Sequence, residues 1–352
     1  MKSKTSGLLR RGRALVVVIA TAGAIAACQT TSMGPQPDAA DPTPPKRMIT
    51  QGTATRIVAQ NLTKCAYTHQ KMNVRVAAVG EITATDGTVI TMPAVTALQK
   101  GAGIPLSHDL YNECNKVAPA NSAAVSTDAV PVIEVDADGE VITGFVVADN
   151  YYEMYVNGKL VSVDNTPYTP FNSAIVKFKV KRPYTLAFLV VDWDEHLGLG
   201  MEVFPVPITP KTSKYYPGDG GLIAKFSDGT TTDGTWKAQT FYIGPLMDPK
   251  EVVERGHVHD TPGLGGRTHP YARKPACEDK CYAVHYPVPA NWQSPRFNDH
   301  YWPRAWEYTD QEIGVRNLRG YTLYPELFSG ARWIWTQNLV LDNVMIARKT
   351  VR

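Results

Sequence analysis

The amino-acid sequence predicts a mainly β protein built around an antiparallel β-sandwich. Apolar and polar residues alternate with period two over several runs, Asp-Gly or Asn-Gly pairs separate these runs, and no stretch is long and periodic enough for a major helix. Successive side chains on a strand point to opposite faces, and Asx-Gly pairs favour tight hairpin turns. The pattern therefore favours two stacked antiparallel layers over a catalytic α/β body.

Residues 48–130 are predicted to form a small, mixed, β-rich N-terminal region. The stretch "MNVRVAAVGEITATDGTVITMPAV" holds two β-rich runs around Asp86-Gly87, which is a hairpin signature. The following "TALQKGAGIPLSHDLYNEC" is typical of a short helix broken by glycine and proline.

Residues 131–352 are predicted to form the sandwich itself. Strand runs flank Asp138-Gly139, Asn157-Gly158 and Asp228-Gly229. In "YYEMYVNGKLV" the alternation places Tyr151 and Glu153 on one face and Tyr152, with Met154, on the other. "SAIVKFKVKRPYTLAFLVVDW" alternates and then becomes continuously apolar, as expected of a buried strand, and "ARWIWTQNLVLDNVMIARKTV" closes the chain. The stretch from 246 to 290 is expected to be a long inserted loop.

The first 27 residues have the pattern of a signal peptide. A basic leader precedes a short apolar run that ends in "IAAC", so the run is too short for a good transmembrane helix. This end resembles a bacterial lipobox, and the resemblance implies cleavage before Cys28 and lipid attachment to it. Gln29 follows the cysteine where an inner-membrane retention signal usually has Asp, so an outer-membrane lipoprotein facing the periplasm or the surface is expected. Residues 28–47 are expected to form the lipidated cysteine and a flexible tether, because they are rich in Pro, Ser, Thr and Asp.

The charge balance argues against a nucleic-acid partner. The chain has 36 basic and 33 acidic residues, and five of the basic ones lie in the leader, which leaves 31 against 33 after cleavage. Binding to nucleic acid would require a basic face, and the remaining chain offers no such excess. The expected partners are the membrane, through the lipid, and a carbohydrate or an envelope protein.

The four other cysteines are expected to form disulfides, because an even number in an exported chain favours crosslinks over thiols. Three pairings are possible, and pairing within one region favours Cys65–Cys114 and Cys277–Cys281. A four-cysteine zinc site is disfavoured because no Cys-x-x-Cys pair occurs.

Three segments together resemble the galactose-binding-like jelly roll, including the accessory sandwich beside the catalytic domain of α-L-rhamnosidases. They are "YEMYVNGKLV", "LIAKFSDGTTTDGTWKA" and "WQSPRFNDHYWPRAWEY", and the resemblance covers roughly residues 140–350. It implies a jelly-roll sandwich that binds a ligand or serves a structural role. No catalytic barrel or toroid follows, so glycosidase activity is not implied.

The predicted ligand site combines aromatic planes with polar neighbours. Sugar rings stack their C–H faces on exposed aromatic rings, while Asn, Asp and Arg bind hydroxyls. The residues expected to do this are Asp149, Asn150, Tyr151, Tyr152, Trp302 and Arg304. Core packing is the alternative for each aromatic residue, because such side chains bury much apolar area.

Two stretches could bind a metal. Asp192, Asp194 and Glu195, in "DWDEHLGLG", offer hard oxygen ligands for Ca²⁺, and the resemblance makes a structural Ca²⁺ a candidate cofactor. His257, His259 and Asp260 form the other cluster, although a polar loop explains this spacing equally well and a transition metal is not favoured.

The sequence thus favours a non-catalytic, membrane-anchored lipoprotein that binds a carbohydrate or similar polar ligand. No Gly-x-Ser-x-Gly elbow or phosphate-binding loop occurs. Two alternatives stay open: a docking subunit of an envelope protein complex, and a metal-dependent enzyme that uses the His257/His259 loop.

Overall fold

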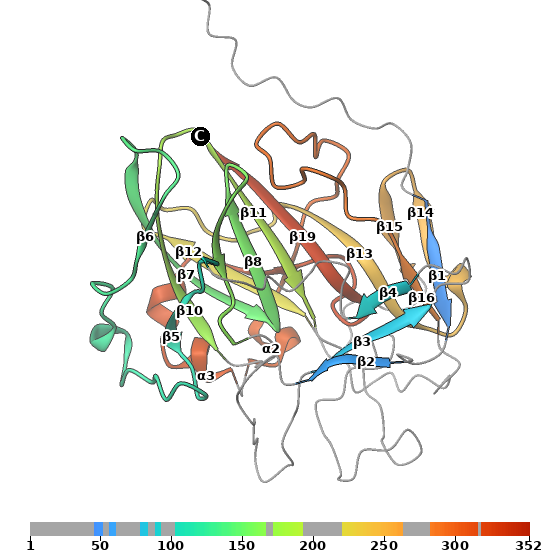
Figure 1. Cartoon of the computed structure of the whole chain (residues 1–352), viewed down its shortest axis with the longest axis horizontal. Coiled ribbons are helices and arrows are strands. Elements are labelled where there is room, and N and C mark those ends of the chain that lie inside the picture. The colour runs from blue at the N-terminus through green and yellow to red at the C-terminus, as the bar shows by residue number, and fades with distance from the viewer. Residues whose placement is uncertain are drawn as a thin grey trace, which may run out of the picture. The chain divides into compact units, whose positions relative to one another are not determined.

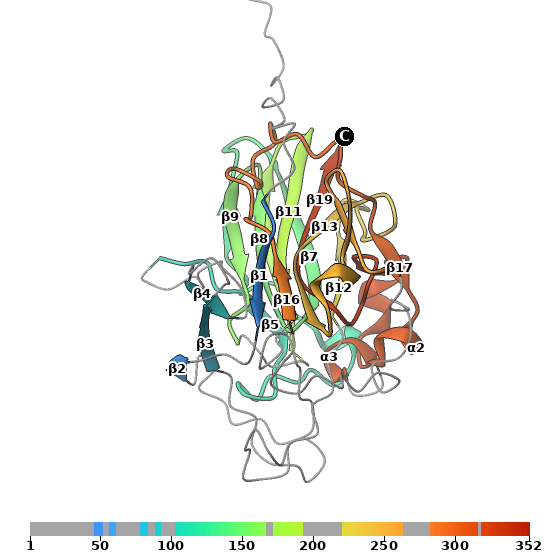
Figure 2. The same cartoon turned by 90° about the vertical axis from the view of Figure 1, so that its right-hand side faces the viewer.

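The predicted β-sandwich is confirmed by the computed structural model, which describes residues 46–51, 56–60, 78–83, 89–92, 103–166, 172–192, 220–262, 282–315 and 318–352. The first sheet has the order β1 (Met48–Gln51), β16 (Tyr282–His285), β13 (Lys237–Leu246), β19 (Asp342–Val351), β11 (Tyr184–Val191), β8 (Tyr151–Val156) and β9 (Lys159–Val163), with antiparallel neighbours throughout. Figures 1 and 2 both show β8, β11 and β19 as neighbours.

The second sheet has the order β17 (Trp306–Tyr308), β18 (Trp333–Trp335), β12 (Gly221–Phe226), β7 (Glu140–Asp149), β10 (Ser173–Val180) and β5 (His108–Tyr111). Strand β6 (Val132–Glu134) also pairs with β10, in parallel. The helical elements are short: η1 (Ser122–Ala124), η2 (Pro249–Glu251), α2 (Asp310–Ile313), α3 (Arg319–Thr322) and η7 (Pro325–Phe328). Two smaller sheets consist of β14 (Val253–Arg255) with β15 (Val258–Asp260), and of β2 (Arg56–Gln60), β3 (Ala78–Thr83) and β4 (Val89–Met92).

The sandwich takes strands from the region that was expected to be a separate N-terminal part. Strand β1 pairs with β16 at the edge of the first sheet, and β5 pairs with β10 in the second. The expected boundary at residue 131 is therefore wrong for these two strands. Their partners lie far away in the sequence, and local patterning gives no information about such pairing.

The turn signatures behave largely as expected. Asn157 and Gly158 have φ values of 50° and 83°, so both adopt the left-handed conformation that a two-residue hairpin between β8 and β9 requires. At Asp228-Gly229 the Phe226 amide donates to the Thr230 carbonyl at 2.8 Å. Strands β3 and β4 pair as predicted, although their turn lies outside the described residues. Asp138-Gly139 lies between β6 and β7, but both strands pair with β10 and not with each other.

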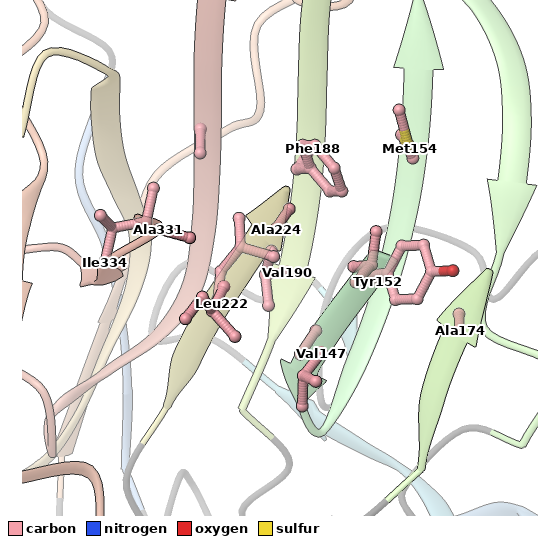
Figure 3. Packing of buried hydrophobic residues seen from close by; sticks show 14 of the residues in the cluster. Val147, Tyr152, Met154, Ala174, Phe188, Val190, Leu222, Ala224, Ala331 and Ile334 are labelled. Carbon is pink, nitrogen blue, oxygen red and sulfur yellow. The ribbon is translucent and has the colours of Figure 1, made fainter. Parts of the chain in front are cut away.

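The first sheet is buried on both of its faces. Tyr152 and Met154 of β8 pack in the core between the two sheets (Figure 3), whereas Tyr151 belongs to a second apolar cluster on the opposite face. Strand β11 divides in the same way, with Phe188 in the first cluster and Leu189 in the second. This double burial explains why "YTLAFLVV" is continuously apolar.

Segments distant in sequence supply the second cluster. Trp292, Trp302 and Val252 pack there against Leu189 and Ile346 of the sheet. A cover of this kind turns what would be a solvated sheet face into a second core. Within the described residues, no helix is long and apolar enough to cross a membrane.

Cys114 forms a disulfide, as the sequence predicts for the cysteines. Cys28, Cys65, Cys277 and Cys281 lie outside the described residues. The pairing and the lipidation therefore stay predictions.

Candidate functional site

Tyr151 and Tyr152, which were predicted to bind the ligand, are buried in the protein interior. Tyr151 and Tyr152 are 1% and 2% exposed, and the neighbouring Asp149 and Asn150 are also buried. The Tyr152 ring lies 6.1 Å from the Phe188 ring, and its hydroxyl is 2.9 Å from the Ser162 hydroxyl. Figure 3 shows Tyr152 among the aliphatic side chains of the core between the sheets. This stretch therefore offers no open aromatic surface.

Trp302 is also buried, and it does not converge with Tyr152. Its ring makes edge contacts with Phe241 at 5.7 Å and with Phe297 at 5.3 Å. These residues belong to the second cluster, whereas Tyr152 belongs to the first, so the first sheet separates them. The alternation in the sequence was correct, but both faces that it defined are covered.

Arg304 is the predicted ligand residue that lies at the surface, and two aromatic side chains near it in the chain are exposed too. Tyr301 is 54% exposed and Trp306 is 37% exposed. Arg304 and Trp306 are two residues apart on extended backbone, so both side chains leave the same face of this segment. We call Tyr301, Arg304 and Trp306, with His257 and His300, the aromatic strip.

The backbone of residues 303–308, which carries Arg304 and Trp306, is paired with two other segments in turn. The Ala238 amide donates to the Pro303 carbonyl at 3.0 Å, and the Ala305 amide donates to the Trp236 carbonyl at 2.9 Å. Trp306 then pairs with Trp335 as β17 joins β18. Residues 303–308 therefore lead from the start of β13 in the first sheet to β18 in the second sheet on a hydrogen-bonded backbone.

Two histidines contact the exposed tyrosine. The His257 ring stacks on the Tyr301 ring with centroids 5.4 Å apart and planes 24° apart, and the His300 ring meets it edge-on at 5.3 Å. These contacts restrict the rotation of a ring that is more than half exposed. A preoriented, exposed aromatic plane of this kind can accept an apolar ligand face.

The charged groups around the strip leave Arg304 available. Glu307 accepts from the Gly234 amide at 2.7 Å, and Asp299 accepts from Arg348 at 2.8 Å. Lys237 donates to the carbonyls of His300 and Trp302. In the described part of the chain no ion pair involves Arg304, so its guanidinium can bind a polar or anionic ligand group.

The predicted histidine cluster does not gather around one point. His259 is buried, and its ring stacks on Tyr286 with centroids 3.4 Å apart, whereas His257 stacks on Tyr301. Burial lowers the pKa of His259 to about 4, so this ring is neutral at pH 7. Asp260 is buried, and its Oδ1 has no hydrogen-bond partner among the described residues.

No group of three or more potential metal ligands occurs among the residues that the structure describes. Asp192 is buried, while Asp194 and Glu195 lie outside these residues. The calcium prediction at this loop therefore stays a prediction.

Tyr301, His300 and Trp306 are the members of the strip that were not among the predicted site residues. The first two stand beside Trp302 in "NDHYWPRAWEY", and adjacent aromatics of similar type gave no reason to prefer one. The structure separates them at the turn 299–302, where the Trp302 amide donates to the Asp299 carbonyl at 3.0 Å and Trp302 is buried while Tyr301 is exposed. Comparison with protein-family models, with curated proteins and with solved structures finds no match to this chain.

Proposed function

We propose that this protein binds a carbohydrate or a similar polar ligand at the aromatic strip, as a non-catalytic, membrane-anchored envelope lipoprotein. The single observation that supports this most is the Tyr301 ring, 54% exposed and held by contacts with His257 and His300. An exposed large aromatic side chain that is held in one orientation loses little conformational freedom when a ligand stacks on it.

The neighbouring groups complement such a ring. Arg304 offers a planar set of N–H donors for ligand hydroxyls or carboxylates, and Trp306 offers a second aromatic surface on the same segment. Ligand sites commonly combine a few apolar surfaces with a small number of oriented polar groups. The strip has both kinds on a paired backbone.

A glycan array followed by calorimetry tests the proposal. The wild-type chain is expected to retain at least one envelope-type polysaccharide, and Tyr301→Ala is expected to weaken its affinity about tenfold or more, which corresponds to about 1.4 kcal/mol. Leu106→Ala is the matched control, because Leu106 is 62% exposed and lies outside the strip.

Two outcomes would contradict the proposal in different ways. If the wild-type chain binds no saccharide, the ligand class is wrong. If it binds one and both Tyr301→Ala and Trp306→Ala leave the affinity unchanged, the strip is not the site.

The alternative function is docking to a protein of the envelope. Strand β17 ends the second sheet and carries Trp306 at its start, and a partner strand or loop could cover that edge. Crosslinking at Trp306, replaced by a photoreactive residue in intact envelopes, separates the two functions. A single crosslinked protein favours docking, whereas competition by a soluble glycan favours saccharide binding.

A further inference from the structure

The surface beside the point where the chain enters the sandwich has a composition distinct from the aromatic strip. The first described residues, Lys46 and Arg47, lead into β1. The Arg47 guanidinium donates to the Pro249 carbonyl in η2 and lies 4.0 Å from the Glu254 carboxylate in β14. Figure 1 shows β1, β14, β15 and β16 together at this edge. The entry point is therefore fixed against residues 247–255.

Residues 247–255 place apolar side chains in solvent. Met247 is 58% exposed and Val253 is 36% exposed, and η2 lies between them. Both belong to the minority of large apolar side chains that the described structure exposes to this degree. Their position on either side of a short helical turn makes them protrusions that a partner could bury.

Exposed cations belong to the same segments as the entry point and these two side chains. Lys46, Lys250 and Arg255 are exposed, and in the described part of the chain none of them forms an ion pair. With Arg47 they are the basic residues of what we call the entry surface, residues 46–47 and 247–255.

The acidic residues of the entry surface accept hydrogen bonds from the protein. Asp248 accepts from the Lys250 amide at 2.8 Å, Glu251 from the Met247 amide at 3.1 Å, and Glu254 from the Tyr286 hydroxyl at 2.9 Å. Asp248 and Glu254 are nevertheless exposed, so the entry surface has four basic and three acidic residues, which is a net charge of +1. Its exposed side chains also include the apolar Met247 and Val253.

We infer that the entry surface rests on an anionic phospholipid bilayer. The negative surface potential of such a bilayer attracts basic side chains, and apolar side chains that enter the headgroup region add to the binding. The inference rests on the lipid anchor of the proposed function, because without the anchor the entry surface would bind the bilayer only weakly. It is independent of saccharide binding at the aromatic strip.

Because the tether keeps the entry surface near the bilayer, a weak interaction between the two is enough to hold them in contact. Residues 28–45 lie outside the described residues, and a chain of about 18 residues between the expected lipid at Cys28 and the entry surface can reach at most about 60 Å. A surface held within that distance faces the bilayer at an effective concentration of roughly millimolar. Because the entry surface begins where the tether ends, it is the part of the sandwich that the tether brings closest to the lipid.

Lipid-dependent quenching of a fluorophore tests the inference. The lipidated full-length mature chain is placed in phosphatidylcholine vesicles that contain phosphatidylglycerol and a headgroup nitroxide, after confirming that the parent protein takes up no thiol-reactive label. Val253→Cys carries the label, and Val141→Cys is the matched control because Val141 is an exposed strand valine in β7 of the other sheet. Quenching at 253 is expected to be at least twice that at 141.

The charge contribution is tested in the same vesicles. Lys250→Glu with Arg255→Glu is expected to reduce quenching at 253 to the level at 141, while flotation with the vesicles stays unchanged. Removing phosphatidylglycerol is expected to have the same effect.

The outcomes distinguish the inference from the anchor. A chain that does not float with vesicles overturns both. A chain that floats but shows equal quenching at 253 and 141, or quenching that the charge reversal leaves unchanged, overturns the membrane-contact surface and leaves the anchor intact. Burial of the 253 label in detergent, without vesicles and dependent on protein concentration, would assign the surface to a second copy and would also overturn the inference.

Discussion

The Arg348 guanidinium donates from Nε to the Asp299 carboxylate at 2.8 Å, beside Trp292 and Phe297 of the second apolar cluster. Arg348 is 2% exposed, and it also donates to the carbonyls of Trp292 and Ser294 while its guanidinium lies 5.1 Å from the Phe297 ring centre. A residue of the sheet therefore holds the whole segment that leads into the aromatic strip. The strip is exposed, but its support is buried.

Replacing Arg348 by Ala is expected to lower the free energy of unfolding by about 3 kcal/mol, because the Asp299 carboxylate and two carbonyls lose their donor. The value lies at the lower end for a buried pair because the Asp299 side chain is 28% exposed and water can reach it. Urea unfolding monitored by tryptophan fluorescence measures the change. Arg304→Ala is the control, an exposed arginine of the same segment, and it should stay within about 0.5 kcal/mol of wild type. Equal effects of the two substitutions would contradict the anchoring role of Arg348.

Tyr152 and Tyr301 are expected to respond to truncation in opposite ways. Tyr152→Ala should destabilise the chain by about 3–5 kcal/mol because it empties a core position, and Tyr152→Phe by about 1 kcal/mol because it removes the hydrogen bond to Ser162. Tyr301→Ala should leave stability within about 0.5 kcal/mol, because the ring is largely exposed. Thermal unfolding, with affinity measured in parallel, checks both. A loss of ligand affinity in folded Tyr152→Phe that matches the loss in Tyr301→Ala would contradict the assignment of the site.

Two buried ionisable residues, His285 and Asp342, are expected to change the free energy of unfolding with pH in opposite directions. Burial lowers the pKa of His285 to about 3 and raises the pKa of Asp342 to about 7. Below about pH 6.5 His285 becomes protonated in the unfolded state but stays neutral in the folded state. The free energy of unfolding therefore falls as the pH falls. The folded state keeps the Asp342 proton above pH 4, so stability falls as pH rises from about 4 toward 7.

Replacing each residue alone should reveal its contribution to the slope of the unfolding free energy against pH. Asp342→Asn is expected to make the pH slope of the unfolding free energy more positive by about 1.4 kcal/mol per pH unit between pH 4 and 6.5. His285→Gln should shift the slope by a similar amount in the negative direction, and its amide can still bind the Thr50 hydroxyl, which lies 2.7 Å from the imidazole. Urea titrations at four pH values measure both. Parallel pH profiles for wild type and Asp342→Asn would mean that this carboxyl titrates as an ordinary one.

The disulfide at Cys114 is expected to join Cys65. Peptide mapping without reduction should find these two cysteines in one linked fragment, and Cys277 with Cys281 in another. Closing a loop of about 50 residues is expected to contribute about 4 kcal/mol, so Cys65→Ser should lower the denaturation midpoint strongly and leave one reactive thiol. A linked fragment that joins Cys114 to Cys277 or Cys281 would contradict the pairing.

The amino-acid sequence was sufficient to predict the features that depend on neighbouring residues. Period-two alternation identified the strands, the Asn157-Gly158 pair identified the β8–β9 hairpin, and the alternation placed Tyr151 and Tyr152 on opposite faces. Each of these depends on backbone geometry over a few residues, which sequence patterns report directly.

Which of these strand faces are exposed to solvent depends on how distant segments pack in the folded chain. Trp292 and Trp302 belong to the cluster on the outer face of the first sheet and come more than 100 residues after β8 and β11, and β1 reaches the edge of this sheet from the other end of the chain. An alternating pattern specifies that a strand has two faces, but it carries no information about the distant segments that bury them. Tyr152 was therefore indistinguishable from a ligand-facing aromatic residue in the sequence, while Tyr301, in a turn, is the one that lies open.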